Sequence, residues 1–271
     1  MSHRVRAGWS KRLDHDFWIF LFIGFLAQVV EGSMGMAYGL ICTTALLAAG
    51  IAPATASASV HVAKILTSGA SASSHFRHGN VDKPLLWVLV LTGCIGGAAG
   101  AFLITGLDPA TVKPFVVIYL GLMGLLILWR AFKGVGSRPM HWFKGLPLGL
   151  VGGFLDGVGG GGWGPTVTST LVGAGREPRK AVGTSNVAQF FVAVVISGAF
   201  LASYLTGHWK TAVGLADQNW SVVGVIVGGL IAAPMAGRLA KVLPPRILTW
   251  AVGLLVVGLA IWQTLTLYKL I

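Results

Sequence analysis

The stretch DGVGGGG, residues 156–162, interrupts a long apolar segment that runs over residues 141–175. A second stretch, EGSMG at residues 31–35, interrupts the apolar segment over residues 17–50. Glycine clusters break helices because glycine loses the most backbone freedom on ordering. We therefore expect each of these two segments to form two shorter helices that are joined at a glycine break.

The two breaks belong to an internal repeat. With a shift of 125 residues and no gap, 11 of the 34 positions from Glu31 to Lys64 are identical to those from Asp156 to Gln189. Shared apolar composition would give roughly four identities, and the alternative is two unrelated segments rich in glycine and alanine. Helix breaks at corresponding positions of two halves point to the binding site of a transporter.

The composition places the chain in a lipid environment. Hydrophobic residues make up 55% of the sequence and charged residues 10%, with a mean hydropathy of +0.78. Soluble domains carry about 25% charged residues, which they need to cover their surface. Six stretches approach the roughly 20 apolar residues that span a bilayer: 53–76, 84–106, 112–131, 178–204, 220–239 and 247–268. We expect an all-α integral membrane protein.

The basic residues favour one arrangement of the two halves. If each broken segment is a hairpin that enters and leaves on one side, each half crosses three times, and the halves are inverted. The short loops then hold 12 Lys and Arg residues inside against 3 outside, as the positive-inside rule requires. If each broken segment instead crossed the membrane once, the same loops would hold 8 Lys and Arg residues on one side against 7 on the other. We expect an N-terminal tail (1–16), repeat 1 (17–133), a loop (134–140) and repeat 2 (141–271).

Other readings of the charge and of the cysteines are weaker. The net charge of +12 does not indicate nucleic-acid binding, because the basic residues flank apolar stretches and form no stripe with interleaved aromatics. Cys42 and Cys94 lie in apolar segments without metal-ligand spacing, so they are interpreted as small hydrophobic residues. His75 and His78 have no third ligand nearby. We expect no metal, no cofactor and no nucleic-acid partner.

A polar stripe marks the segment over residues 53–76. Its members recur at steps of 4, 3, 4, 3 and 4, which places them on one helix face: Ser57, His61, Lys64, Ser68, Ser71 and His75. A lysine in the middle of a spanning helix costs about 2.5–3.5 kcal/mol, so it normally faces a cavity or a counter-charge. We expect Ser57, His61 and Lys64 to face an anion. The alternatives are a Lys64 that pairs with Glu31 and a structural His61.

The second half offers neutral polar groups at the equivalent place. Asn186 and Gln189 align with His61 and Lys64, and Thr184 and Ser185 precede them. We expect these four residues to form the opposite wall of a site between the halves, although hydrogen bonds between helices would also explain them.

The glycine breaks add two further candidate groups. A helix that starts after Gly162 leaves backbone N–H groups free for an anion, which makes the following glycines candidate binding residues: Gly159, Gly160, Gly161 and Gly162. Glu31 and Asp156 precede the two breaks at equivalent positions. Carboxylates inside a membrane often relay protons, but they could equally cap the breaks.

From residue 17 to residue 268, the chain resembles the sulfite exporter TauE/SafE family of membrane permeases. The resemblance rests on GVGGGGWGP at residues 157–165, followed by AVGTS at residues 181–185. The first half departs from this pattern, with Leu40 in place of the proline and ASASV at residues 56–60. The resemblance implies export of sulfite, organosulfonates or related anions across the bacterial inner membrane. It gives no support to Lys64 or His61, which rest on their spacing alone.

These observations predict a secondary transporter and not an enzyme, because no nucleophile–base arrangement is evident. Its substrate would be a small sulfur-containing anion, bound between the halves. The sequence has no ATP-binding motif, so an ion, proton or substrate gradient must drive transport. Glu31 or Asp156 would couple transport to protons. The alternatives are a passive anion channel and a membrane enzyme or assembly factor.

Overall fold

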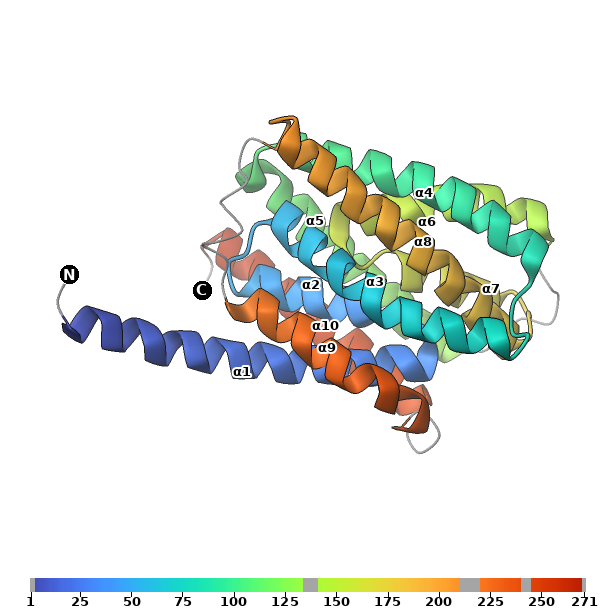
Figure 1. Cartoon of the computed structure of the whole chain (residues 1–271), viewed down its shortest axis with the longest axis horizontal. Coiled ribbons are helices and arrows are strands. Elements are labelled where there is room, and N and C mark those ends of the chain that lie inside the picture. The colour runs from blue at the N-terminus through green and yellow to red at the C-terminus, as the bar shows by residue number, and fades with distance from the viewer. Residues whose placement is uncertain (1–2, 134–140, 210–219, 240–244, 270–271) are drawn as a thin grey trace.

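The computed structural model describes residues 3–133, 141–209, 220–239 and 245–269. Each regular element in these ranges is helical (Figure 1), with the following bounds: α1 (His3–Met34), α2 (Tyr38–Ala48), α3 (Pro53–Arg77), α4 (Lys83–Gly106), α5 (Pro109–Lys133), the 3-10 turn η1 (Trp142–Lys144), α6 (Gly145–Gly159), the π-helical turn η2 (Gly164–Thr168), α7 (Ser169–Gly173), α8 (Pro178–Leu205), α9 (Trp220–Leu239) and α10 (Pro245–Leu267). The segment expected to be a tail, residues 1–16, lies within α1 from His3 onward.

Local sequence sets where several helices begin. Pro53, Pro178 and Pro245 are each the first residue of a helix. Proline fits this position because its missing N–H would have no partner there and its φ is already helical. Before α4, the carboxylate of Asp82 accepts a hydrogen bond from the N–H of Leu85 at 3.2 Å, which satisfies a free donor of the first turn.

The helices form an all-α membrane protein. By length and composition, four of them are able to cross a bilayer: Lys83–Gly106, Pro109–Phe132, Pro178–Leu205 and Arg246–Leu267. These are four of the six predicted spans. The other two are α3, which carries the polar stripe, and α9, whose apolar part is the shorter Trp220–Pro234. Large apolar side chains such as Leu91 and Phe115 are 64% and 68% exposed, as suits a surface that faces lipid.

Glycines let two pairs of helices run parallel with their backbones in contact. Along α1 and α9, a Cβ added at Gly224 would meet Phe17, and one added at Gly228 would meet Phe25. α4 and α6 pack in the same way, through these contacts: Gly96 with Leu150, Gly100 with Phe154, and Gly153 with Gly93. Small residues allow membrane helices this close approach.

Two other pairs run antiparallel. α3 and α8 meet in opposite order along the chain, as Figure 1 shows. Their contacts are His61 with Phe200, Gly69 with Phe190, and Ser71 with Asn186. α5 and α10 do the same, through Gly121 with Ala260, Gly124 with Val257, and Phe132 with Trp250. The two helices that carry the aligned polar residues, α3 and α8, therefore lie side by side.

Both predicted helix breaks are present, at positions that differ slightly from expectation. α1 continues through Glu31 to Met34, so the first break covers residues 35–37, and the second covers residues 160–163 after α6. Gly35 and Gly160 adopt φ of 65° and 67°. Only glycine reaches this left-handed region without strain, which explains why the helices stop there.

Several helix boundaries recur with the 125-residue shift of the sequence repeat. α1 and α6 end at Met34 and Gly159, and α2 and α7 end at Ala48 and Gly173. α3 and α8 begin at Pro53 and Pro178. The packing partners recur as well. In the first half α1 and α3 both pack on α9, and in the second half their equivalents α6 and α8 both pack on α4.

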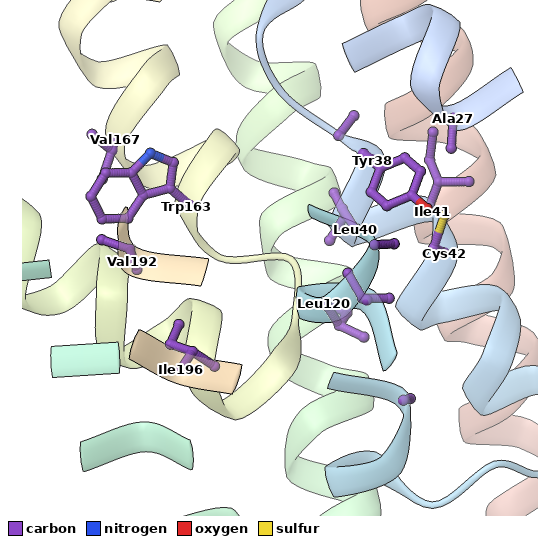
Figure 2. Packing of buried hydrophobic residues seen from close by; sticks show 14 of the residues in the cluster. Ala27, Tyr38, Leu40, Ile41, Cys42, Leu120, Trp163, Val167, Val192 and Ile196 are labelled. Atoms are coloured by element: carbon purple, nitrogen blue, oxygen red, sulfur yellow. The ribbon is translucent and has the colours of Figure 1, made fainter. Parts of the chain in front are cut away.

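Two buried aromatic residues hold the segments that follow the breaks. Tyr38 starts α2 and Trp163 precedes η2, and neither side chain is exposed. Figure 2 shows Trp163 beside Val167, Val192 and Ile196, while Tyr38 lies among Ala27, Ile41 and Cys42. Each ring also donates a hydrogen bond: Trp163 Nε1 to Ser185 Oγ at 3.0 Å, and Tyr38 OH to the carbonyl of Val225 at 3.1 Å. Both breaks are thus fixed to the neighbouring helices.

Candidate functional site

Each glycine break lies against the helix that follows the other break. A Cβ added at Gly39 would collide with the carbonyl oxygen of Gly160. One added at Gly161 would collide with the backbone of Leu40, and one at Gly164 with Met36. The absence of side chains at these glycines is therefore what allows each break to touch the start of the helix that follows the other break. Irregular backbone at membrane depth occurs where protein or a cavity covers it.

Lys64 of the polar stripe reaches this meeting point and forms a buried ion pair. Its Nζ lies 2.9 Å and 3.1 Å from the two carboxylate oxygens of Asp156, and the residue is 2% exposed. The same Nζ donates to the carbonyl oxygen of Gly160 at 2.9 Å. The ion pair of Lys64 is with Asp156 and not with Glu31.

His61 lies next to Asp156. Its Nδ1 lies 2.8 Å from the carbonyl oxygen of Ser57, which can only accept, so this nitrogen carries a hydrogen. Its Nε2 lies 3.2 Å from Oδ2 of Asp156. A bare ring nitrogen and an ionised carboxylate would repel each other, so the contact requires a proton on one of the two groups. Ser57 itself donates to the carbonyl of Gly157 at 2.8 Å.

Protonation therefore sets the charge of this cluster. Lys64 and an ionised Asp156 cancel each other. One further proton, held by His61 or by Asp156, leaves the three side chains with a net positive charge. All three are buried, where charges interact more strongly than in water. The net charge of the three side chains therefore depends on this one proton.

The carboxylates of both halves also cap the breaks. Oδ1 of Asp156 accepts from the N–H of Trp163 at 3.1 Å. Oε2 of Glu31 accepts from the N–H of Tyr38 at 2.7 Å. The two contacts are related by the 125-residue shift. Their geometry is that of the capping role considered for both carboxylates. Asp156 differs from Glu31 because it also binds Lys64 and His61.

Three consecutive polar residues of the second half bind different partners in the structure. Thr184 accepts from the N–H of Asp82 at 2.9 Å, and Ser185 binds Trp163 and Thr168. Asn186 donates to Ser71 at 3.0 Å across the α3–α8 contact. Thr184, Ser185 and Asn186 therefore make hydrogen bonds between elements, which is the alternative interpretation given for them above.

Gln189 and the glycine run keep only some of their hydrogen-bonding groups free for a ligand. Gln189 is 2% exposed, and its Oε1 has no hydrogen-bond partner among the described residues. The N–H of Gly160 donates to the carbonyl of Asp156 at 2.6 Å, and Trp163 donates as described above. Gly162 accepts from the N–H of Thr166 at 3.2 Å. The N–H groups expected to be free after the break are therefore partly used.

Sequence reasoning missed two residues at this site, Tyr119 of α5 and Thr43 of α2. A Cβ added at Gly162 would lie 2.5 Å from the hydroxyl of Tyr119, and one added at Gly160 would collide with the hydroxyl of Thr43. A lone tyrosine inside a predicted span was the signal available for Tyr119. Among the described residues, no group of three His, Cys, Asp or Glu side chains could hold a metal ion.

Comparison with known proteins reveals similar chains. The profile of the sulfite exporter TauE/SafE family matches residues 20–262. "Probable membrane transporter protein YtnM" of Bacillus subtilis is 41% identical over 243 residues, which cover 87% of this chain and 78% of the relative. A "Probable membrane transporter protein" of Haemophilus influenzae is 28% identical over 218 residues, with 76% and 81% covered. No solved structure matches the chain.

Proposed function

Because the chain belongs to the sulfite exporter TauE/SafE family, we propose that this membrane transporter exports a small sulfur-containing anion, such as sulfite or an organosulfonate. It would act as a secondary transporter in the bacterial inner membrane, with several crossings of the bilayer. The names of its relatives describe membrane transporters and support transport rather than an enzymatic reaction.

The two halves are proposed to be inverted repeats around the site. The recurring helix boundaries and the recurring packing partners support this relation. The equivalent helices α3 and α8 run antiparallel, and so do α5 and α10, as expected when one half is turned over in the membrane. Inverted repeats place a transporter's binding site near the midplane, where their broken helices meet.

One observation carries the proposed site: Lys64, His61 and Asp156 meet beside the second break, in a contact that requires a proton. In the protonated state the cluster has a net positive charge and suits an anion. Without the proton, Asp156 neutralises Lys64 and the attraction is lost. The glycine run, the amide group of Gln189, and Ser57 after release of its hydrogen bond to Gly157 would supply hydrogen bonds around this centre.

The same cluster would couple transport to protons. If the anion binds more tightly when the proton is present, then the proton must bind more tightly when the anion is present. Anion and proton would therefore cross together, so a pH gradient would change the rate and direction of anion flux. We assign the coupling role to Asp156 first, because it contacts both Lys64 and His61. Glu31 is the second candidate.

Flux measurements in proteoliposomes test this function. Vesicles that contain the purified protein should release or accumulate labelled sulfite or sulfonates such as taurine and sulfoacetate, and a pH gradient should change the rate. Movement of a cation with none of these anions would show that the substrate class is wrong. Anion flux at channel rates, unaffected by the pH gradient, would show that the protein is a channel.

A further inference from the structure

Two buried hydroxyl groups at the second glycine break have no hydrogen-bond partner among the described residues. The hydroxyls of Thr43 on α2 and Tyr119 on α5 are buried and make no hydrogen bond within the described part of the chain. Both lie against the break, Thr43 at Gly160 and Tyr119 at Gly162. Leaving a buried hydroxyl unpaired is unfavourable, so a binding partner that arrives later would explain why they are kept.

The equivalent threonine of the second half shows what Thr43 lacks. Thr168 aligns with Thr43 under the 125-residue shift, and its hydroxyl lies 2.6 Å from that of Ser185. The first-half residue that aligns with Ser185 is Val60, which has no hydroxyl to offer. Thr43 therefore keeps the polar group of the repeat without its partner.

Thr43 also differs from its neighbour Thr44 on the same helix. The hydroxyl of Thr44 donates to the carbonyl oxygen of Leu40 at 2.6 Å, one turn earlier. The hydroxyl of Thr43 instead points to the break, where a Cβ at residue 160 would meet it. Residue 160 is also the one whose carbonyl oxygen binds Nζ of Lys64. One residue of the break thus contacts both the cation and an unpaired hydroxyl.

We propose that the hydroxyls of Thr43 and Tyr119 bind the oxygens of the transported anion at the glycine break. This inference rests on the proposed function and adds a basis for selecting oxyanions. Two O–H groups at Gly160 and Gly162 of one break can each donate to a different oxygen of a pyramidal sulfite or a tetrahedral sulfonate. Hydrogen bonds from neutral donors to a charged acceptor are stronger than those between neutral groups.

The test removes each hydroxyl while keeping the side-chain shape. In Thr43→Val and Tyr119→Phe, the KM for sulfite should rise about tenfold, which corresponds to about 1.4 kcal/mol. Thermal stability of the free protein should stay equal or rise, because a buried group without a partner has been removed. The matched controls are Thr44→Val, whose hydroxyl is bound to Leu40, and Tyr204→Phe, a residue 44% exposed on α8. Both should leave the KM unchanged.

Three results would contradict the proposals, and they are distinguishable. An unchanged KM in both Thr43→Val and Tyr119→Phe, with a wild type that transports sulfite, would overturn the role of the hydroxyls and leave the proposed function intact. A second result is a KM that rises together with a fall in melting temperature, by the same amounts in the two variants as in the two controls. That result would assign the hydroxyls to folding. A wild type that moves neither sulfite nor a sulfonate would overturn the proposed function itself.

Discussion

At the scale of single residues, the buried pair of Lys64 and Asp156 links stability to charge. Removing one partner of a buried ion pair leaves an uncompensated charge, which typically costs about 3–5 kcal/mol. Replacing both partners by neutral groups avoids this cost. The same two residues are those to which we assign anion binding and proton coupling, so their structural and transport effects have to be separated.

A double-mutant cycle separates the two effects. Lys64→Met should strongly lower the unfolding temperature and reduce transport at least about tenfold, a loss of about 1.4 kcal/mol or more. The double variant Lys64→Met/Asp156→Asn should recover much of the stability but not the transport. Lys64→Arg should remain partly active, since the charge is kept while its shape changes. Normal transport by a well-folded Lys64→Met protein would assign Lys64 to structure alone.

Proton coupling is tested at the two carboxylates. Asp156→Asn leaves the charge of Lys64 unopposed at every pH, so anions should still exchange at equal pH while a pH jump no longer drives flux. Glu31→Gln serves as the comparison, because an amide oxygen can still accept the hydrogen bond from Tyr38. It should respond to the pH jump as the wild type does. If both variants follow the gradient normally, neither carboxylate couples transport and their role is capping.

At the scale of helices and breaks, glycine has opposite consequences at two places. Gly160 adopts φ 67°, and a Cβ there would collide with the hydroxyl of Thr43 and approach the backbone of Ser57. Gly198 lies inside α8 with no atom within 4 Å of an added Cβ. Only the first position therefore needs glycine for its backbone conformation and for its contacts.

Alanine substitution distinguishes these two glycines. Gly160→Ala should lower the free energy of unfolding by at least about 1–2 kcal/mol, the cost of a left-handed conformation for a residue with a Cβ. Gly198→Ala should instead raise it by roughly 0.5–1 kcal/mol, because alanine favours the helix. Thermal unfolding in detergent measures both. Equal melting temperatures for the two variants would contradict the strain assigned to the break.

At the scale of the whole molecule, the helix ends divide between two faces. The end of α3 meets the start of α8, where Asp82 binds Thr184. The ends of α4 and α8 meet at the opposite face, where Phe102 stacks on His208 with ring centroids 3.9 Å apart. The basic loops 77–83 and 173–180 therefore share one face, which the positive-inside rule assigns to the cytoplasm.

Cysteine labelling tests this topology in a protein without Cys42 and Cys94. Single cysteines at Ala174 and Ser137 should react from the cytoplasmic side, although Ser137 lies outside the described residues. A cysteine at Leu107, between α4 and α5, should react from the other side. Labelling of positions 174 and 137 from opposite sides would exclude the hairpin arrangement of the second half.

Sequence alone determined the features that depend on local order. The composition indicates lipid as the solvent, the glycine clusters predict that α1 and α6 stop within a few residues of them, and the 125-residue shift predicts the matching boundaries of several helices. The spacing of Ser57, His61 and Lys64 specifies one helix face. These features need only backbone conformation and helical periodicity, which neighbouring residues control.

Tertiary structure decided which of these groups meet. Lys64 could have faced either carboxylate, and only the packing of α3 against α6 pairs it with Asp156, 92 residues away. The same packing commits Thr184 and Ser185 to contacts between elements, and it leaves Thr43 without the partner that its equivalent has. Rotation and depth of a helix depend on contacts with distant segments, and no local pattern in the sequence records them.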